Sequence, residues 1–225
     1  EGLAGASTGL DKRTRCRACF AWWTLNFAIG ACEYRSQEAS WPDKNGGYYG
    51  AHVAADADTT VLHGAKIIEA VKQAGIEYVL SVPDLHTSRG LLFPIADDKD
   101  LNLVRVCKED ECLGIAAGLT YADKRSLILL QYTGFLYALN AIRAVGVEYK
   151  TPAILMIGML GKEPGVLPQD SARYGLRIIE PILDAMGIPH IHIETDADVA
   201  GIVPAITKAY ETPFPVAILI GGRAI

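Results

Sequence analysis

Short apolar runs alternate with segments of helical spacing from residue 57 onward, and this alternation limits the possible fold more than any other feature. The strands of a parallel sheet show near-continuous apolar runs because helices cover both faces of the sheet. The sequence therefore predicts an α/β fold with a doubly wound, mainly parallel sheet of about six strands and helices on both faces. The expected strands are 78–82, 103–106, 127–130, 153–157, 191–193 and 216–220.

The segments between these runs are expected to form helices, with Gly75 ending the first helix and Pro83 ending the first strand. In a doubly wound sheet, ligands bind beyond the carboxyl ends of the strands. Functional side chains are therefore expected in the loops 83–86, 107–111, 131–134 and 158–163. The expected helices lie at about 61–75, 85–95, 109–122, 135–147, 170–186 and 197–210.

The first quarter of the chain differs in composition from the rest. All three tryptophans and three of the five cysteines lie there, without sustained helical or strand periodicity. We interpret residues 1–57 as an extension of unknown status and residues 58–225 as the folded domain. Cys16 and Cys19 have the spacing of a zinc or redox pair, but no second pair follows, so incidental cysteines are the favoured interpretation.

Charge and cysteine content exclude several classes of protein. The 21 Lys and Arg residues are outnumbered by 26 Asp and Glu residues, so the chain lacks the basic footprint of a nucleic-acid-binding protein. The longest apolar run, 18–32, is shorter than the roughly 20 residues that span a bilayer, so no membrane partner is expected. Five cysteines are an odd number, which favours a reducing, cytoplasmic location.

Several familiar catalytic motifs are absent from the chain. It contains no Gly-x-Gly-x-x-Gly, Gly-Lys-Ser/Thr, Gly-x-Ser-x-Gly or His-Glu-x-x-His. Hydride transfer and nucleotide hydrolysis therefore lose their usual support in the sequence.

The most specific local pattern is a strand that runs into a helix headed by three consecutive acids, Glu109, Asp110 and Glu111. Two interpretations are open from the residues alone. The favoured one is that the acids complement the helix dipole, which contributes a few tenths to about 1 kcal/mol each. The other is that one of them acts on a ligand at the end of the strand.

Glu109 is followed nine residues later by Gly118-Leu-Thr-Tyr-Ala122. This pattern resembles the signature of the pyrimidine-binding domain of thiamine-diphosphate enzymes. Four further segments resemble, in order, one branch of that superfamily, the sulfopyruvate decarboxylase alpha subunits and the matching half of phosphonopyruvate decarboxylases. The resemblance covers roughly residues 58–222. The four segments are 81–84, 131–134 with 138–140 following, 158–164 and 178–189.

The resemblance implies a chemistry for Glu109. In this superfamily a glutamate hydrogen-bonds N1′ of the aminopyrimidine ring and thereby promotes deprotonation of the thiazolium C2, which attacks a 2-oxo acid and allows loss of CO₂. Glu109 is the matching catalytic and cofactor-binding residue. The other implied cofactor-binding residues are Pro83, Gln131, Thr133 and Gly134, and the candidate substrate-binding residues are Asp84 and His86.

The implied activity is carboxy-lyase activity of one subunit in a heteromer, converting 3-sulfopyruvate to sulfoacetaldehyde and CO₂ with thiamine diphosphate. In the family, Mg²⁺ and the diphosphate are held by a domain that carries Gly-Asp-Gly, which this chain lacks. The resemblance therefore implies a separate beta subunit and at least two copies of each chain. The open alternatives are a phosphonopyruvate decarboxylase or acetolactate-type subunit, and an inactive partner that only stabilises another subunit.

Two loops depart from the family pattern. Related decarboxylases have Gln-Asn-Ser-Gly where this chain has Gln131-Tyr-Thr-Gly134, and Pro-Asp-Ser where it has Pro83-Asp-Leu85. Thr133 keeps the hydroxyl group, whereas Tyr132 and Leu85 do not keep the groups they replace. Of the properties that the resemblance implies, specificity for a sulfonate substrate is therefore the one that it supports least. His86 is either an acid or anion-binding group or, in the favoured interpretation, a surface residue.

Other polar residues have two interpretations each. His190 and His192 share one face of an expected strand, a spacing compatible with a metal pair, but no third ligand is evident nearby in the sequence, so an ordinary strand without metal is favoured. Arg89, Lys162 and Arg173 are either ligands of an anionic substrate or solvated surface charges.

Overall fold

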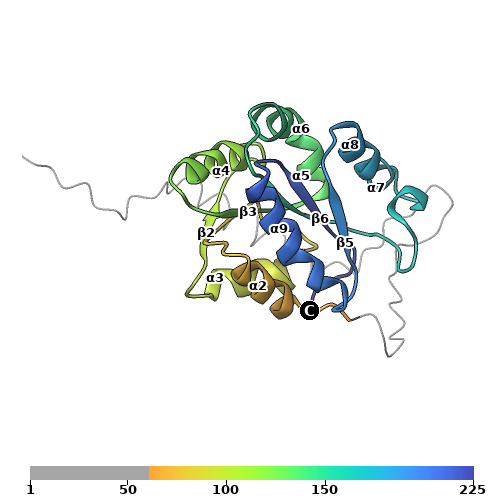
Figure 1. Cartoon of the computed structure of the whole chain (residues 1–225). Coiled ribbons are helices and arrows are strands. Elements are labelled where there is room, and N and C mark those ends of the chain that lie inside the picture. Colours follow the sequence, from red (N-terminus) through yellow and green to blue (C-terminus); the bar gives the residue numbers. More distant parts are fainter. Residues whose placement is uncertain (1–60) are drawn as a thin grey trace, which may run out of the picture. The chain divides into compact units, whose positions relative to one another are not determined.

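The computed structural model describes residues 61–225, which contain a six-stranded sheet in the order β2-β1-β3-β4-β6-β5. Every neighbouring pair of strands is parallel. The predicted fold class is therefore confirmed, and each predicted strand is present (Figure 1). The strands are β1 (Tyr78–Ser81), β2 (Asn102–Arg105), β3 (Ser126–Gln131), β4 (Ile154–Gly158), β5 (His190–Ile193) and β6 (Val216–Ile220).

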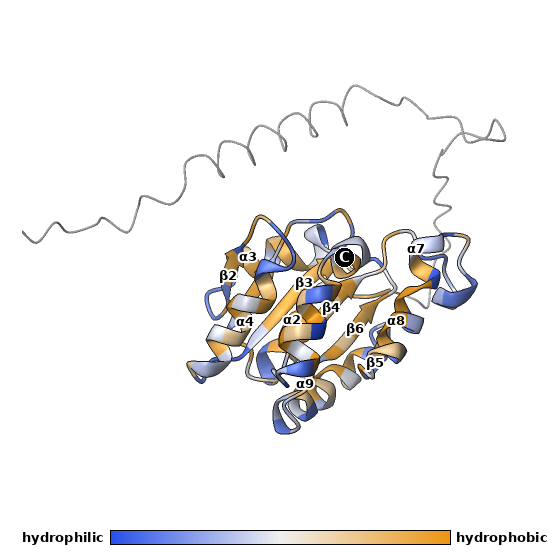
Figure 2. Ribbon diagram, turned by 90° about the horizontal axis from the view of Figure 1, so that it is seen from above, coloured by the Kyte–Doolittle hydropathy of each residue, from blue (hydrophilic) through white to orange (hydrophobic). Residues whose placement is uncertain are grey.

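The central strands are apolar on both faces because each face is covered by a separate core. In β3, Leu127 and Leu129 belong to one core, whereas Ile128 and Leu130 point to the other. Fully burying a side chain of this size contributes about 1.5–3 kcal/mol. Figure 2 shows the strands as an apolar centre between helices whose outer faces are more hydrophilic.

One core lies between one face of the sheet and the helices formed by the first and last parts of the domain. Helix α2 presents Ile67, Ile68 and Val71 to this core, which is the spacing that the sequence predicted. Gly75 follows the helix with a φ of +78°, a conformation that glycine adopts without strain. The elements of this layer are α2 (Gly64–Gln73), η1 (Ser88–Leu92), α3 (Phe93–Asp97), η4 (Asp198–Gly201) and α9 (Ile202–Glu211).

The other core lies between the opposite face and the remaining helices, which Figure 1 shows on the far side of the sheet from α2 and α9. Helix α4 buries Cys112, Leu113 and Ala116 there. The elements of this layer are α4 (Glu111–Tyr121), α5 (Tyr132–Tyr137), α6 (Leu139–Ala141), η2 (Ile142–Glu148), η3 (Pro168–Asp170), α7 (Tyr174–Arg177) and α8 (Ile179–Ala185).

Several predicted helices are shorter or more divided than expected. The helix expected at 85–95 is a π-helical segment, η1, followed by α3, and Pro94 lies at the start of α3, where the missing N–H costs nothing. The helix expected at 109–122 begins at Glu111. Glu111 stabilises the turn before the helix, because its Oε2 accepts hydrogen bonds from the backbone N–H groups of Cys107 and Lys108 at 3.0 and 3.3 Å.

The predicted extension, residues 1–57, lies outside the described residues, so the predicted domain boundary remains a prediction. Within residues 61–225, no helix has both the length and the apolar composition that crossing a membrane requires.

Candidate active site

The strand order places the candidate site at the carboxyl edge of the sheet. From β1, the second strand of the sheet, the chain passes to β2 at the edge and then returns to β3 on the other side of β1. Crevices for ligands form at such switch points, beyond the carboxyl ends of the strands. The loops after β1 and β2 and the junction of β3 with α5 carry all seven residues that were predicted to contact cofactor or substrate.

The structure brings Glu109 and Gly134 into direct contact. A Cβ atom placed on Gly134 would lie 2.6 Å from the Glu109 Cγ and 2.8 Å from its Oε1, which is closer than real Cβ contacts. Gly134 is in the first turn of α5, directly after β3, and Glu109 is in the turn that follows β2. Only glycine at position 134 leaves room for the Glu109 side chain. The two residues, which we call the Glu109–Gly134 unit, therefore lie in contact although they are far apart in the sequence.

The Glu109 side chain is half-buried and available to a ligand. Within the described part of the chain, no hydrogen-bond donor is paired with its carboxylate. The neighbouring Asp110 has a buried Oδ1 atom that also lacks a partner among residues 61–225. Burial, followed by the charges of Glu109 and Glu111, raises the pKa of the nearby Cys112 thiol to about 12, so this cysteine is a neutral core residue.

Gln131 and Thr133 lie beside this unit. The Gln131 Nε2 donates a hydrogen bond to the Thr133 Oγ1 at 2.9 Å, which fixes both side chains at the start of α5. Tyr132 packs instead toward α7, because a Cβ on Gly175 would lie 2.7 Å from the Tyr132 Cε2. The residue that departs most from the family pattern in this loop is therefore accommodated by a glycine on another helix.

The loop after β1 is held together by Asp84. Its Oδ1 accepts hydrogen bonds from the backbone N–H groups of His86 and Thr87 at 2.6 and 2.7 Å, and its Oδ2 accepts one from the Thr87 hydroxyl at 2.6 Å. The Ser88 hydroxyl donates to the Asp84 carbonyl oxygen. Asp84 thus organises the turn into η1, and Pro83 is half-buried at the start of the same loop.

His86 is buried, with only 7% of its surface exposed, so the favoured interpretation as a surface residue is wrong. Its Nε2–H donates a hydrogen bond to the Ile220 carbonyl oxygen at 3.1 Å, at the end of β6. It also packs on β4, since a Cβ on Gly158 would lie 3.0 Å from the His86 Cδ2. Burial lowers the pKa of the imidazole below its ordinary value, more than the Ile220 carbonyl raises it.

We expect the stability of the protein to fall in mild acid because of His86. The unfolded chain takes up a proton on this side chain near pH 6.5, whereas the folded chain does so only at lower pH. The stabilisation is therefore complete above about pH 6.5 and is lost as the pH falls, by up to about 1.4 kcal/mol per pH unit.

The measurement is urea unfolding of the full chain and of His86→Gln between pH 8 and pH 5. The unfolding free energy of the unsubstituted protein minus that of the variant should decrease as the pH falls. Taking this difference cancels the pH dependence of every other titrating group that the two proteins share. A difference for His86→Gln that stays constant across this range would contradict the prediction.

The three candidate cations occupy different environments. Lys162 has a side chain that is 1% exposed, and its Nζ lies 2.6 Å from the Glu194 Oε1, so its interpretation as a solvated surface charge is wrong. Arg173 is exposed, and its Nε donates to the Gly161 carbonyl oxygen at 3.1 Å. Arg89 is exposed on η1. Sequence reasoning missed Glu194 because a strand end far along the chain gave no signal for this pairing.

The residues at the β2 and β3 ends fit the aminopyrimidine part of thiamine diphosphate. The half-buried Glu109 carboxylate has no donor within residues 61–225, and Gly134 leaves the space in which it lies. A ring nitrogen that shares a proton with a carboxyl group requires such an acceptor. Nothing in the chain supplies the Gly-Asp-Gly that marks the diphosphate and Mg²⁺ half.

No family model matches the chain. It is similar to the sulfopyruvate decarboxylase subunit alpha of Methanocaldococcus jannaschii, with 31% identity over 158 residues, which are 68% of this chain and 89% of that protein. The protein of the same name from Methanococcus maripaludis is 24% identical over 156 residues, 68% of this chain and 91% of that protein. A third, from Methanothermobacter thermautotrophicus, is 30% identical over 97 residues, 43% of this chain and 58% of that protein. The chain therefore belongs to the family of sulfopyruvate decarboxylase alpha subunits.

Proposed function

We propose that this chain is the alpha subunit of a thiamine-diphosphate-dependent 2-oxo acid decarboxylase that converts 3-sulfopyruvate to sulfoacetaldehyde and CO₂. The observation that carries the proposal is the contact between Glu109 and Gly134 at the point where the strand order reverses. The names of the relatives support the substrate. The domain that performs this role comprises residues 58–225, and its site is the carboxyl edge of the sheet.

Each residue of the site has a defined task in this proposal. Glu109 holds a proton on its carboxyl group and shares it with N1′ of the aminopyrimidine ring. Gly134 leaves the space in which the Glu109 side chain lies, and the pair formed by Gln131 and Thr133 fixes the first turn of α5, which contains Gly134. Bound thiamine diphosphate supplies the electron sink for the loss of CO₂.

The loop after β1 has a supporting role in the same site. Pro83 begins this loop, and Asp84 and the neutral, buried His86 hold it against the ends of β4 and β6. A substrate that approaches the cofactor from this side meets a fixed loop rather than a mobile one. We propose that the exposed Leu85, next to these two residues, contributes to the choice between substrates.

The proposal includes a beta subunit, because the relatives are named as alpha subunits and the chain has no Gly-Asp-Gly. In this arrangement the beta subunit holds Mg²⁺ and the diphosphate, and the alpha subunit presents Glu109. The half-buried carboxylate without a donor in residues 61–225 is compatible with a site that a second chain completes.

The test is reconstitution with the cognate beta subunit, thiamine diphosphate and Mg²⁺. CO₂ release is measured from 3-sulfopyruvate, phosphonopyruvate and pyruvate at equal concentration. We expect the highest kcat/KM with 3-sulfopyruvate. A higher value with phosphonopyruvate or pyruvate would replace the proposed substrate. If the beta subunit is fully active without this chain, this chain is instead a stabilising partner.

A further inference from the structure

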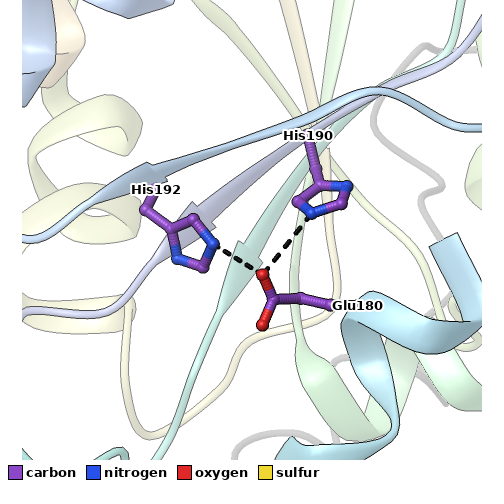
Figure 3. Close-up of side chains that lie close together, drawn as sticks. All are labelled: Glu180, His190 and His192. Carbon is purple, nitrogen blue, oxygen red and sulfur yellow. Dashed lines mark hydrogen bonds and ion pairs between the residues drawn. The ribbon is translucent and has the colours of Figure 1, made fainter. Parts of the chain in front are cut away.

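Three side chains meet at the opposite edge of the sheet from β2, where β5 packs against α8. Figure 3 shows the imidazole rings of His190 and His192, both on β5, directed at the carboxylate of Glu180 on α8. The His192 Nε2 lies 2.8 Å from the Glu180 Oε1, and the His190 Nε2 lies 3.5 Å from the same oxygen. The potential ligand atoms of the three residues all lie within 4.8 Å of one another.

Glu180 is an acidic group near the histidines that no pattern in the sequence indicated. The two histidines share a strand face because side chains alternate along a strand, as the sequence predicted. The carboxylate reaches them only because α8 lies over that face. The interpretation of β5 as an ordinary strand rested on the lack of such a group, and the structure supplies it.

The surroundings orient His190 as metal ligands are usually oriented. Its Nδ1 lies 3.4 Å from the Ile188 carbonyl oxygen and 3.9 Å from the Asp184 Oδ1. Since a carbonyl oxygen only accepts, an N–H on Nδ1 donates to it, and this orientation directs the Nε2 atom at Glu180. A histidine that binds a metal typically donates its other N–H to a carbonyl or carboxylate in this way.

The Glu180 carboxylate is short of partners for its position. Its side chain is 16% exposed, and its Oε2 is buried with no hydrogen-bond partner among the described residues. Its Oε1 faces the Nε2 atoms of both histidines. A lone pair of a neutral His190 and a carboxylate oxygen repel each other unless a cation lies between them, and either a proton or a metal ion can fill this role.

We propose that Glu180, His190 and His192 form a binding site for a divalent transition-metal ion of the zinc type. Two imidazole nitrogens and one carboxylate oxygen suit Zn²⁺ and its neighbours, whereas Mg²⁺ and Ca²⁺ prefer sites made of oxygen ligands. Ligands of a tetrahedral Zn²⁺ lie about 3.3 Å apart, given bond lengths near 2.0–2.1 Å. The two distances to the Glu180 Oε1 bracket this value.

The site has room for an exchangeable fourth ligand. The side chain of His192 is 34% exposed and that of His190 is 18% exposed, so the cluster is partly open to solvent. Three protein ligands and one water are the arrangement of sites that keep an open position. The ion would tie α8 to the edge strand β5, so its expected effect is on the stability of this edge.

The first test measures binding of Zn²⁺ to the full chain by calorimetry after treatment with a chelator. Because Cys16 and Cys19 could also bind zinc, the background for all variants is Cys16→Ser/Cys19→Ser. We expect one equivalent of Zn²⁺ to bind. Zn²⁺ at about 100 times Kd should raise the midpoint of thermal unfolding by about 5–10 °C.

The second test assigns the ligands with matched variants. Glu180→Gln and His192→Gln should each weaken binding by at least about 100-fold and abolish the thermal shift. The control is His63→Gln, because His63 also pairs with a carboxylate, that of Asp196 at 2.7 Å, but no second histidine lies beside it within residues 61–225. It should leave binding unchanged. Circular dichroism at 20 °C checks that each variant is folded.

Cobalt provides a readout that does not depend on stability. Co²⁺ bound by nitrogen and oxygen ligands gives visible ligand-field bands without the near-ultraviolet thiolate band that cysteine ligands produce. We expect this spectrum, and we expect its loss in His190→Gln. Unchanged zinc affinity in the Glu180 and His192 variants, or binding only at millimolar zinc, would overturn the proposal and leave the cluster as a protonated ion pair.

Discussion

We expect Glu109→Gln in the reconstituted complex to lower kcat for decarboxylation by roughly 10²–10⁴-fold, the range in which a positioned proton-transfer group contributes. An amide has nearly the same shape as the carboxyl group, so the contact with Gly134 is kept. It cannot exchange a proton with a ring nitrogen, however, and this exchange is the proposed task of the residue. Steady-state assays with 3-sulfopyruvate measure the effect, and gel filtration measures assembly.

The matched control is Glu69→Gln, which removes the same charge from an exposed position on α2. It should leave kcat within about twofold of the original value, since surface substitutions seldom matter. If Glu109→Gln retains near-normal turnover in an intact complex, Glu109 does not carry the proton. If assembly itself is lost, Glu109→Asp, which keeps the acid but shortens the side chain, separates chemistry from packing.

The second large effect is expected from Gly134→Ala. The added methyl group would lie 2.6 Å from the Glu109 Cγ, so the acid has to move away from its position. A displacement of about 1 Å at a catalytic group can cost about 10²-fold in rate. The stability should change little, because alanine gains roughly 0.5–1 kcal/mol over glycine within a helix and the half-buried acid can swing outward. Turnover and thermal unfolding of the variant are measured side by side.

Gly201→Ala is the control for the second prediction. Gly201 has an ordinary helical φ of −74°, and a Cβ there would meet only the Ile191 Cδ1 at 3.5 Å, a normal contact. This variant should keep both activity and stability. A Gly134→Ala enzyme with full turnover would mean that the contact with Glu109 has no part in the reaction.

The sequence predicted the strands well because they depend on local patterns. The role of Glu109 rests on the family resemblance and stays a prediction. Buried parallel strands are apolar throughout, and the strand-to-helix turn with its three acids is contiguous in the chain. Gly134 was predicted, through the family resemblance, as a cofactor-binding residue. Its contact with Glu109 was not predicted, since no local rule connects the ends of β2 and β3. The segmentation into η1 and η2 was not predictable, because the spacing of apolar residues does not distinguish α- from π-helical turns.

The environment of single polar residues was less predictable. His86 was expected at the surface because it lies in a loop, yet that loop folds over the ends of β4 and β6. The Lys162 side chain is buried and pairs with Glu194, which directly follows β5. In both cases the partner comes from a strand far away in the sequence, and its position depends on the order of strands in the sheet.

The role of Glu111 changes how a mutational scan of the three acids should be read. Its carboxylate accepts hydrogen bonds from the backbone N–H groups of Cys107 and Lys108 and so stabilises the turn that carries Glu109. Replacing Glu111 can therefore abolish activity although this side chain does not take part in the reaction. Loss of activity in a Glu111 variant therefore reports a change in the backbone of this turn. Recovery of activity with a residue that restores the two hydrogen bonds would distinguish this effect from a role in the reaction.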